Sequence, residues 1–277
     1  MLQPAFLVLL FSVSYLTWNV ETPRQTLTGA SITYSLPSHR LSLHEPVILT
    51  FSIKNSGNDL INIDLGQNRE GGFAFTVTRP DGRHVELPQY RRDGISRIGT
   101  LSLKPGEAFS QRLILNEWYA FPVAGKYELE GHLIQPIVTG STLEERDPGF
   151  RGAIEVGPRD EPTLSKVCES LADQVDKSQG YEQAAEAALT LSYVTDPVAV
   201  PSLQRVLFAR KIVDGIAIAG LERIGDDQAV RVLVSALDDN LPGDKAILAR
   251  AALQRIEQVT SDATRKETIS RALARSN

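Results

Sequence analysis

The residue types that most often carry out hydrolysis or bind metals are scarce in this sequence. It contains one cysteine and four histidines, namely Cys168, His39, His44, His84 and His132. A zinc peptidase holds its metal with two histidines one helical turn apart and uses the glutamate between them as a base. His44-Glu45 begins such a pattern, but Ile48 stands where the second histidine is needed. We therefore predict no metal site, and we expect the histidines at the surface or at strand edges.

Nucleophilic and phosphate-transfer chemistry also lack their usual patterns. The chain has no Gly-x-Ser-x-Gly turn, and no glycine-rich phosphate loop precedes a predicted helix. Cys168 shares one helical stripe with Leu164, Leu171 and Val175, and a thiol on the apolar face of a helix is normally buried and unreactive. We therefore predict no catalytic residue and no cofactor.

One polar loop carries residue types that bind calcium. Residues 238–240 read Asp-Asp-Asn and are followed by Gly243 and Asp244, and such oxygen ligands can surround a calcium ion. However, Pro242 replaces one ligand, and Ala249 stands where a bidentate glutamate is expected. The pattern favours an ordinary polar loop between two helices.

Two groups of side chains could recognise a partner. Trp118, Tyr119 and Phe121 gather in a predicted loop, where aromatic rings could stack on a sugar or a peptide. The alternative is that they pack over one end of the strands or against the next domain. Arg223 and Arg255 occupy equivalent places in two repeats and could line a groove for an acidic partner. The alternative for them is a solvated helix face.

Composition and charge limit the classes of partner. The 277 residues suit two modest domains, and 42% hydrophobic with 23% charged residues is ordinary for a globular chain. The formal net charge is −5, and neither half is basic. Because binding to DNA or RNA requires a dense field of Lys and Arg against the phosphates, we predict no nucleic-acid partner.

The first residues have the character of an export signal. Ala5 to Trp18 carries no charge, but it is shorter than the roughly 20 apolar residues of a membrane-spanning helix. Ser12 and Ser14 offer the small residues that precede a signal cleavage site. We predict a signal and leader over residues 1–26, and hence a periplasmic or extracellular protein without a stable membrane span after signal removal. The alternatives are a buried first strand and an uncleaved anchor.

From residue 30 to residue 157 the hydrophobic pattern has a period of two. Phe73, Phe75 and Val77 alternate with smaller residues, which predicts a strand with one buried face. Similar alternation occurs at residues 47–54, 61–65, 109–115 and 127–133. Many short strands separated by turn residues predict two antiparallel sheets packed face to face.

One segment of these strands has a recognisable sequence pattern. It contains Pro105-Gly106, then Trp118-Tyr119, and then Tyr127 two residues after a glycine at the start of a strand. This pattern resembles the immunoglobulin-like β-sandwiches of exported bacterial proteins. It also resembles the sandwich that precedes the catalytic domain in deuterolysin-like metallopeptidases. The resemblance implies a fold and no activity.

After Gly157-Pro158 the hydrophobic period changes to that of a helix. Helices are predicted at residues 162–178, 181–194, 197–209, 212–224, 227–238, 243–258 and 262–275. Ala187–Leu191 is repeated by Ala217–Leu221 after 30 residues and by Ala249–Leu253 after 32 more. Small residues in such repeats let helices approach closely, while Leu and Ile fill the space between layers.

This repeat resembles the HEAT-like repeats of phycobilisome lyases. The resemblance implies stacked helical hairpins that present a binding surface, and it implies nothing about lyase activity. Helices 162–178 and 262–275 would cap the two ends of the stack. The predicted fold class is therefore multidomain β + α, with an immunoglobulin-like sandwich at residues 27–157 followed by a short HEAT-like α-solenoid at residues 158–277.

These observations favour a non-catalytic, exported protein whose helical surface binds another protein. Two alternatives stay open at this level. The first is a protease inhibitor or carbohydrate-binding protein that acts through the sandwich, and the second is a hydrolase with an unrecognised site.

Overall fold

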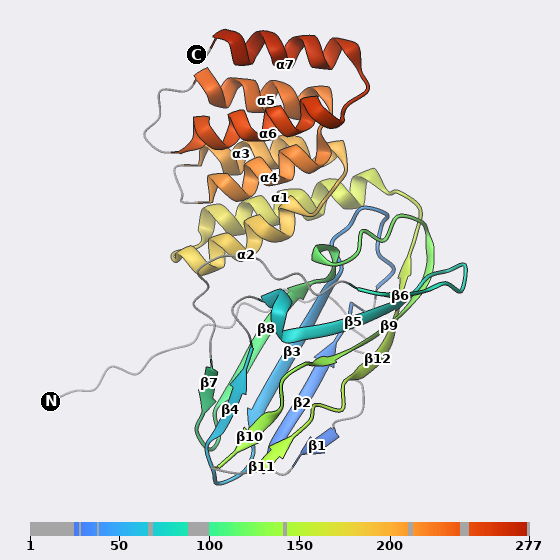
Figure 1. The fold of residues 1–277 in the computed structure, drawn as a ribbon, viewed down its shortest axis with the longest axis vertical. Coiled ribbons are helices and arrows are strands. Elements are labelled where there is room, and N and C mark those ends of the chain that lie inside the picture. Colours follow the sequence, from blue (N-terminus) through green and yellow to red (C-terminus); the bar gives the residue numbers. More distant parts are fainter. Residues whose placement is uncertain are drawn as a thin grey trace, which may run out of the picture.

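The computed structural model describes residues 25–27, 29–37, 39–65, 69–87, 100–140, 143–209, 213–238 and 244–275. Within these ranges strands end at Val156 and the first α-helix begins at Glu161 (Figure 1). We call residues 25–156 the sheet half and residues 161–275 the helical half. Antiparallel sheets followed by helices confirm the coarse order that the sequence predicts. Residues 1–24 of the expected export signal lie outside the described residues.

The strands fall close to the ranges expected from the alternating pattern. Their bounds are β1 Gln25–Leu27, β2 Ala30–Ser35, β3 Ile48–Asn55, β4 Ile61–Asp64, β5 Phe73–Thr78, β6 His84–Glu86, β7 Thr100–Leu103, β8 Ala108–Ile114, β9 Gly125–Leu133, β10 Ile137–Thr139, β11 Leu143–Glu145 and β12 Phe150–Val156. Buried and exposed positions alternate along β2, β3 and β5. That alternation is why one face of each strand can join a common core.

These strands form three four-stranded sheets, where the sequence predicted two. One sheet has the order β1-β2-β3-β8, and the others have the orders β11-β10-β4-β7 and β12-β9-β5-β6. The last two orders correspond strand by strand, because β4 leads into β5, β9 into β10 and β11 into β12. They are two segments of one bent layer that faces the first sheet. The bend, which alternation cannot reveal, is what divides the expected second sheet.

A buried carboxylate satisfies the backbone at this bend. Asp147, only 7% exposed, lies between β11 and β12. It accepts hydrogen bonds from the Leu133 N–H at 2.7 Å, from the Gly149 N–H at 3.0 Å and from the Tyr34 hydroxyl across the core. Because a buried donor without a partner is costly, Asp147 allows β9 to end inside the protein.

Aromatic rings join the two layers of the sheet half. Phe51 of β3 lies 5.2 Å from Phe73 of β5 in an edge-to-face contact, and Tyr34 stacks on Phe150 at 4.8 Å. Near the start of β9, the Tyr127 hydroxyl donates a 2.8 Å hydrogen bond to the carbonyl of Val123. Tyr127 is fully buried, so this bond fixes the loop before β9 onto the core.

The helices also follow the sequence prediction, mostly within one or two residues. Their bounds are α1 Glu161–Lys177, α2 Tyr181–Ser192, α3 Val200–Phe208, α4 Asp214–Ile224, α5 Asp227–Asp238, α6 Lys245–Val259 and α7 Ala263–Arg275. The largest difference is at the start of α3, where Pro197–Ala199 forms a 3-10 turn capped by Asp196.

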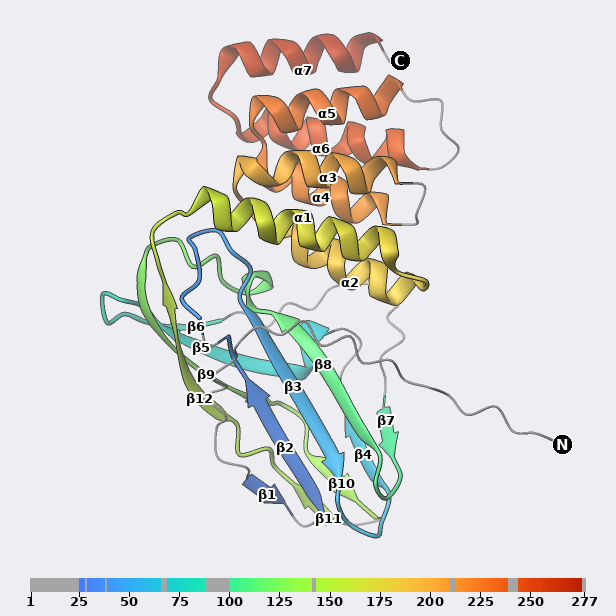
Figure 2. The ribbon, with the colours of Figure 1, turned by 180° about the vertical axis from the view of Figure 1, so that it is seen from behind.

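The helices pack as two layers. One contains α2, α4 and α6, and the other contains α1, α3, α5 and α7 (Figures 1 and 2). The small residues of the repeat are buried between them. A Cβ added to Gly220 of α4 would lie 2.8 Å from Leu203 and 2.9 Å from the backbone of Ser192, so the repeat allows a close approach there. At the far end, α7 buries Ile269 alone, as suits a terminal helix.

The buried carboxylate at the bend leads to a stability prediction. Replacing Asp147→Ala removes the acceptor for two backbone N–H groups and for the Tyr34 hydroxyl, and we expect the free energy of unfolding to fall by about 3–5 kcal/mol. Tyr34→Phe removes one of these bonds without stranding a backbone donor, and it should cost about 1 kcal/mol. Urea denaturation followed by circular dichroism measures both. Equal losses of unfolding free energy in the two variants would show that Asp147 does not stabilise the backbone N–H groups at the bend.

Candidate functional site

The outward face of α2, α4 and α6 carries exposed apolar side chains. Tyr181 is 59% exposed and Ile247 is 67% exposed. On the same three helices, Leu189 and Ile216 are half-buried, and Leu248 packs beside Gly215 of α4. We call this set, Tyr181, Leu189, Ile216, Ile247 and Leu248, the apolar strip. A row of apolar side chains on one layer of a repeat stack is typical of a surface that binds a protein.

The repeated arginines form contacts within the stack. Arg223 lies 4.0 Å above the ring of Tyr193 and donates to the Ser192 carbonyl at 3.1 Å. Arg255, one repeat later, forms two hydrogen bonds of 2.6 and 2.7 Å with the carboxylate of Glu222. Each arginine therefore contacts the preceding repeat. Their equivalent places in the sequence reflect a structural role in packing one hairpin on the next.

The aromatic cluster packs on the sheet half. Trp118 and Phe121 are buried, and Phe121 contacts the rings of Tyr119 and Tyr127 at 5.1 and 5.2 Å. Trp118 meets Phe75 edge-to-face at 5.0 Å. Of the two interpretations, packing over the end of the strands is the one that the structure shows.

The chemistry-bearing residues do not converge. The Nε2 of His39 lies 3.2 Å from Glu45, and His84 contacts Thr78. His132 is exposed on β9, and His44 contacts the helical half. Among the described residues, no group of three His, Cys, Asp or Glu side chains is placed to hold a metal ion.

Two further candidates from the sequence are Cys168 and the polar loop considered for calcium. Cys168 is buried, as its stripe predicts, and burial raises the pKa of its thiol to about 12. Residues 239–243 of the polar loop considered for calcium lie outside the described residues.

An ion pair with a buried carboxylate fixes the connection between the two halves to the helical half. Arg159, in the connection before α1, donates from Nε to Asp196 at 2.5 Å and from Nη2 at 3.0 Å. The Asp196 side chain is only 2% exposed and also accepts the Val198 N–H at 3.0 Å. The hydrogen bonds from Arg159 hold the pKa of the Asp196 carboxyl below its usual value.

Shorter contacts from the sheet half complete this joint. The Ser42 hydroxyl accepts the N–H of Asp160, the residue that caps α1, at 2.8 Å. The Nδ1 of His44 lies 3.0 Å from the Thr195 hydroxyl. The segment before β3 is thereby fixed to both ends of the first hairpin.

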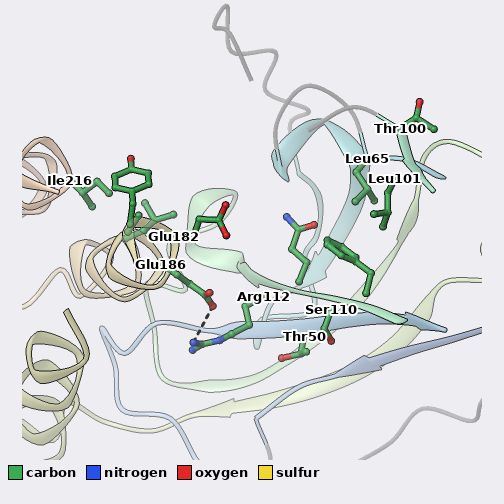
Figure 3. A pocket seen from close by; sticks show the side chains of 14 residues that line it. Thr50, Leu65, Thr100, Leu101, Ser110, Arg112, Glu182, Glu186 and Ile216 are labelled. Carbon is green, nitrogen blue, oxygen red and sulfur yellow. Dashed lines mark ion pairs between the residues drawn. The ribbon is translucent and has the colours of Figure 1, made fainter. Parts of the chain in front are cut away.

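On the other side of this joint lies a groove of about 820 Å³. Its helical wall consists of Tyr181, Glu182, Ala185, Glu186 and Leu189 of α2, together with Ile216 of α4. Its opposite wall consists of Thr50 of β3, of residues 109–112 of β8, and of Leu65, Thr100 and Leu101 at the adjacent sheet (Figure 3). The apolar strip therefore continues directly into the groove.

Two buried hydrogen-bond acceptors line the groove without a donor in the described part of the chain. The Oε1 atoms of Gln111 and Glu186 are buried without a hydrogen-bond partner among the described residues. Arg112 Nη1 lies 3.2 Å from Glu186 Oε1, close enough for an ion pair, but without hydrogen-bond geometry. Glu182 is exposed and points from α2 into the same space (Figure 3). Such a lining suits a partner that brings N–H groups or a positive charge.

Sequence reasoning did not identify this groove. Its residues come from β3, β7, β8, α2 and α4, and no spacing in the chain relates them. The acidic positions of α2 were visible in the sequence, but Arg112, the partner of Glu186, lies in a strand far away along the chain.

The helical half matches a known family of repeats. Residues 215–239, which cover α4 and α5, match the profile of the PBS lyase HEAT-like repeat. The C-terminal half contains HEAT-like repeats. The resemblance expected from the sequence is thus confirmed for that half, and no curated protein matches the chain.

Solved structures give only distant matches. The protein assigned as ApaA in Bordetella pertussis has a TM-score of 0.28 at 13% identity, covering 46% of this chain and 91% of its own. A β-glucosidase from Listeria innocua in complex with isofagomine has a TM-score of 0.27 at 16% identity, covering 49% and 17%. Vertebrate Astrotactin-2 has a TM-score of 0.21 at 11% identity, covering 81% and 39%. All three TM-scores are below 0.5.

The ion pair at the joint predicts a pH-dependent stability. Asp196→Asn should lower the free energy of unfolding at pH 7 by about 1–3 kcal/mol, because hydrogen bonds to a charged group are lost. Folding lowers the pKa of Asp196 below its usual value of 3.8. The stabilisation by the ion pair is therefore present above about pH 4 and is lost as the pH falls further and the carboxylate becomes protonated. In urea denaturation, the free energy of unfolding that Asp196→Asn loses relative to the wild type should therefore be smaller at pH 3 than at pH 7.

Glu130→Gln provides the control for that experiment. Glu130 pairs with Arg151 on the surface of the sheet half, where an ion pair contributes little. A deficit as large for Glu130→Gln as for Asp196→Asn would contradict a special role for the joint.

Proposed function

We propose that this protein is a non-catalytic binding protein that holds another protein against the apolar strip of its HEAT-like stack. The observation that carries the proposal is the exposure of large apolar side chains on one helical layer, with Ile247 67% and Tyr181 59% exposed. Burying one such side chain under a partner would contribute roughly 1.5–3 kcal/mol. Repeats of this kind commonly use one layer as an extended binding face.

Two further features support a binding role over chemistry. The histidines lie at separate places, each with its own neighbours or exposed to solvent, so no two of them meet in one site. The single thiol is buried in the helical core and has a raised pKa, which makes it a poor nucleophile. Arg223 and Arg255 already contact the preceding repeat. We therefore assign the partner to the apolar strip and not to the repeated arginines.

Mutation of the strip should abolish binding while leaving the fold intact. Ile247→Lys places a charge on the exposed face of α6, and we expect at least a tenfold loss in recovery of a specific protein from the envelope fraction of the source organism. Tagged wild-type and variant proteins, compared by pull-down and mass spectrometry, provide the measurement.

Leu60→Lys is the matched control for this variant. Leu60 is an exposed apolar residue of the sheet half, 41% exposed, just before β4, and this variant should recover the same protein as the wild type. Repeated recovery of no specific protein, or equal recovery by Ile247→Lys, would overturn the proposal.

We also propose that the protein is exported, with a signal and leader within residues 1–26. The uncharged stretch from Ala5 to Trp18 supports this proposal. No helix in the part of the chain that the structure describes is long and apolar enough to cross a bilayer. N-terminal sequencing of the protein purified from its native host should find a start after residue 14. A mature chain beginning at Met1 would contradict export by a cleaved signal.

We further propose that the sheet half is a variant of the immunoglobulin-like sandwich. Its support is the hydroxyl of Tyr127, which returns to the Val123 carbonyl four residues upstream. A tyrosine of this kind near the start of a strand is a recurring feature of that fold. The bent second layer would be the departure from the usual form.

A further inference from the structure

The free edge of strand β8 opens into the groove. In the order β1-β2-β3-β8, β8 is the last strand of its sheet, and no described strand pairs with its other side. Successive side chains of a strand point to opposite faces, yet Phe109, Ser110, Gln111 and Arg112 all line the same groove. Residues of both faces can line one groove only where the edge of the strand faces it.

The hydrogen bonds to β3 show which backbone groups are free. The Leu115 N–H donates to Val47, and the carbonyl of Glu107 accepts from Asn55. The register between β3 and β8 runs without interruption from Ile48–Ile114 to Lys54–Ala108. Because the direction of backbone groups alternates along an antiparallel strand, the odd-numbered residues of β8 bond to β3. The N–H and C=O groups of the even-numbered residues, including Ser110 and Arg112, therefore point into the groove.

We propose that this edge binds an extended segment of the partner protein as an added antiparallel or parallel strand. Unpaired backbone groups on an edge strand are a template for such an addition, and the adjoining pockets then select the side chains. The proposal rests on the proposed function, since it specifies which part of the partner enters the groove beside the apolar strip.

The lining of the groove indicates the chemistry of this segment. On one side, Leu65, Leu101 and Phe109 offer an apolar surface. On the other, Glu182 and Glu186 of α2 outnumber the single cation Arg112 among the lining residues (Figure 3). Gln111 Oε1, buried without a donor, is an acceptor for an incoming N–H. A segment with alternating apolar and Lys or Arg residues matches both walls.

A random dodecapeptide library displayed on phage is a direct probe of the full-length protein. We expect selection on the wild type to enrich peptides in which apolar residues alternate with Lys or Arg. Enrichment of no common pattern would overturn the proposal. Glu182→Gln should reduce the enrichment of Lys and Arg while retaining the alternation.

Two proline variants test whether the backbone edge is responsible. Ser110→Pro removes an N–H that points into the groove and leaves the bonds to β3, so the selected peptides should bind at least about tenfold more weakly. Ala108→Pro changes an equally oriented residue at the start of β8, outside the groove lining, and should bind like the wild type. Thermal unfolding tests whether both variants fold. If Ser110→Pro does not fold, Gln111→Leu replaces it and is compared with the wild type by amide hydrogen exchange.

Amide hydrogen exchange gives a readout specific for strand addition. Binding of a selected peptide should slow exchange at the N–H groups of Ser110 and Arg112, measured by NMR, beyond the change at their odd-numbered neighbours. Equal binding by Ser110→Pro together with unchanged exchange would overturn strand addition. If strand addition fails but Ile247→Lys still lowers partner recovery, the proposed function stands. If strand addition is observed but Ile247→Lys does not lower partner recovery, only the role of the apolar strip is removed.

Discussion

The bidentate pair between Arg159 and Asp196 is the interaction on which the arrangement of the molecule depends. A carboxylate that is 2% exposed remains charged only when a cation and hydrogen bonds replace the lost water, and the guanidinium of Arg159 supplies both. Arg159 lies directly before α1, while Asp196 caps the turn before α3. The pair therefore fixes the direction in which the chain leaves the sheets and the position of the first hairpin.

The groove depends on this fixed position because its walls belong to different halves. One wall is α2 and the other is the edge of the sheet half, and the Arg112–Glu186 ion pair crosses between them. That pair is partly exposed on both sides and contributes little by itself. The buried Asp196 carboxylate, together with the contacts of Ser42 and His44, fixes the first hairpin beside the sheet half, and the groove continues into the apolar strip. Binding through both surfaces would use the two halves as one unit.

Polar side chains in the interior serve the backbone in both halves. Asp147 accepts N–H groups at the bend of the second layer, and Asp196 does so at the start of a helical turn. On the exposed surface of the stack, Arg223 reaches back to Ser192, and Arg255 pairs with the Glu222 side chain. These contacts explain why residues that resemble functional candidates in the sequence are occupied in the structure. The exposed apolar residues, which the sequence does not single out, are the ones to which we assign the proposed partner.

The sequence by itself determined the local structure of this protein. Alternation at residues such as Phe73 and Phe75 and the repeats around Ala187, Ala217 and Ala249 predict the strands and helices, because each depends on neighbours a few positions apart. It also predicted that Cys168 is buried.

Only the tertiary structure decided the bend in the second layer, the packing of Trp118 and the groove beside β8. Each of these results from contacts between residues distant in the chain, such as Asp147 with Tyr34 or Arg112 with Glu186. Hydrophobic periodicity records which face of an element is buried, but it does not record which other element covers that face or which strand edge is left open.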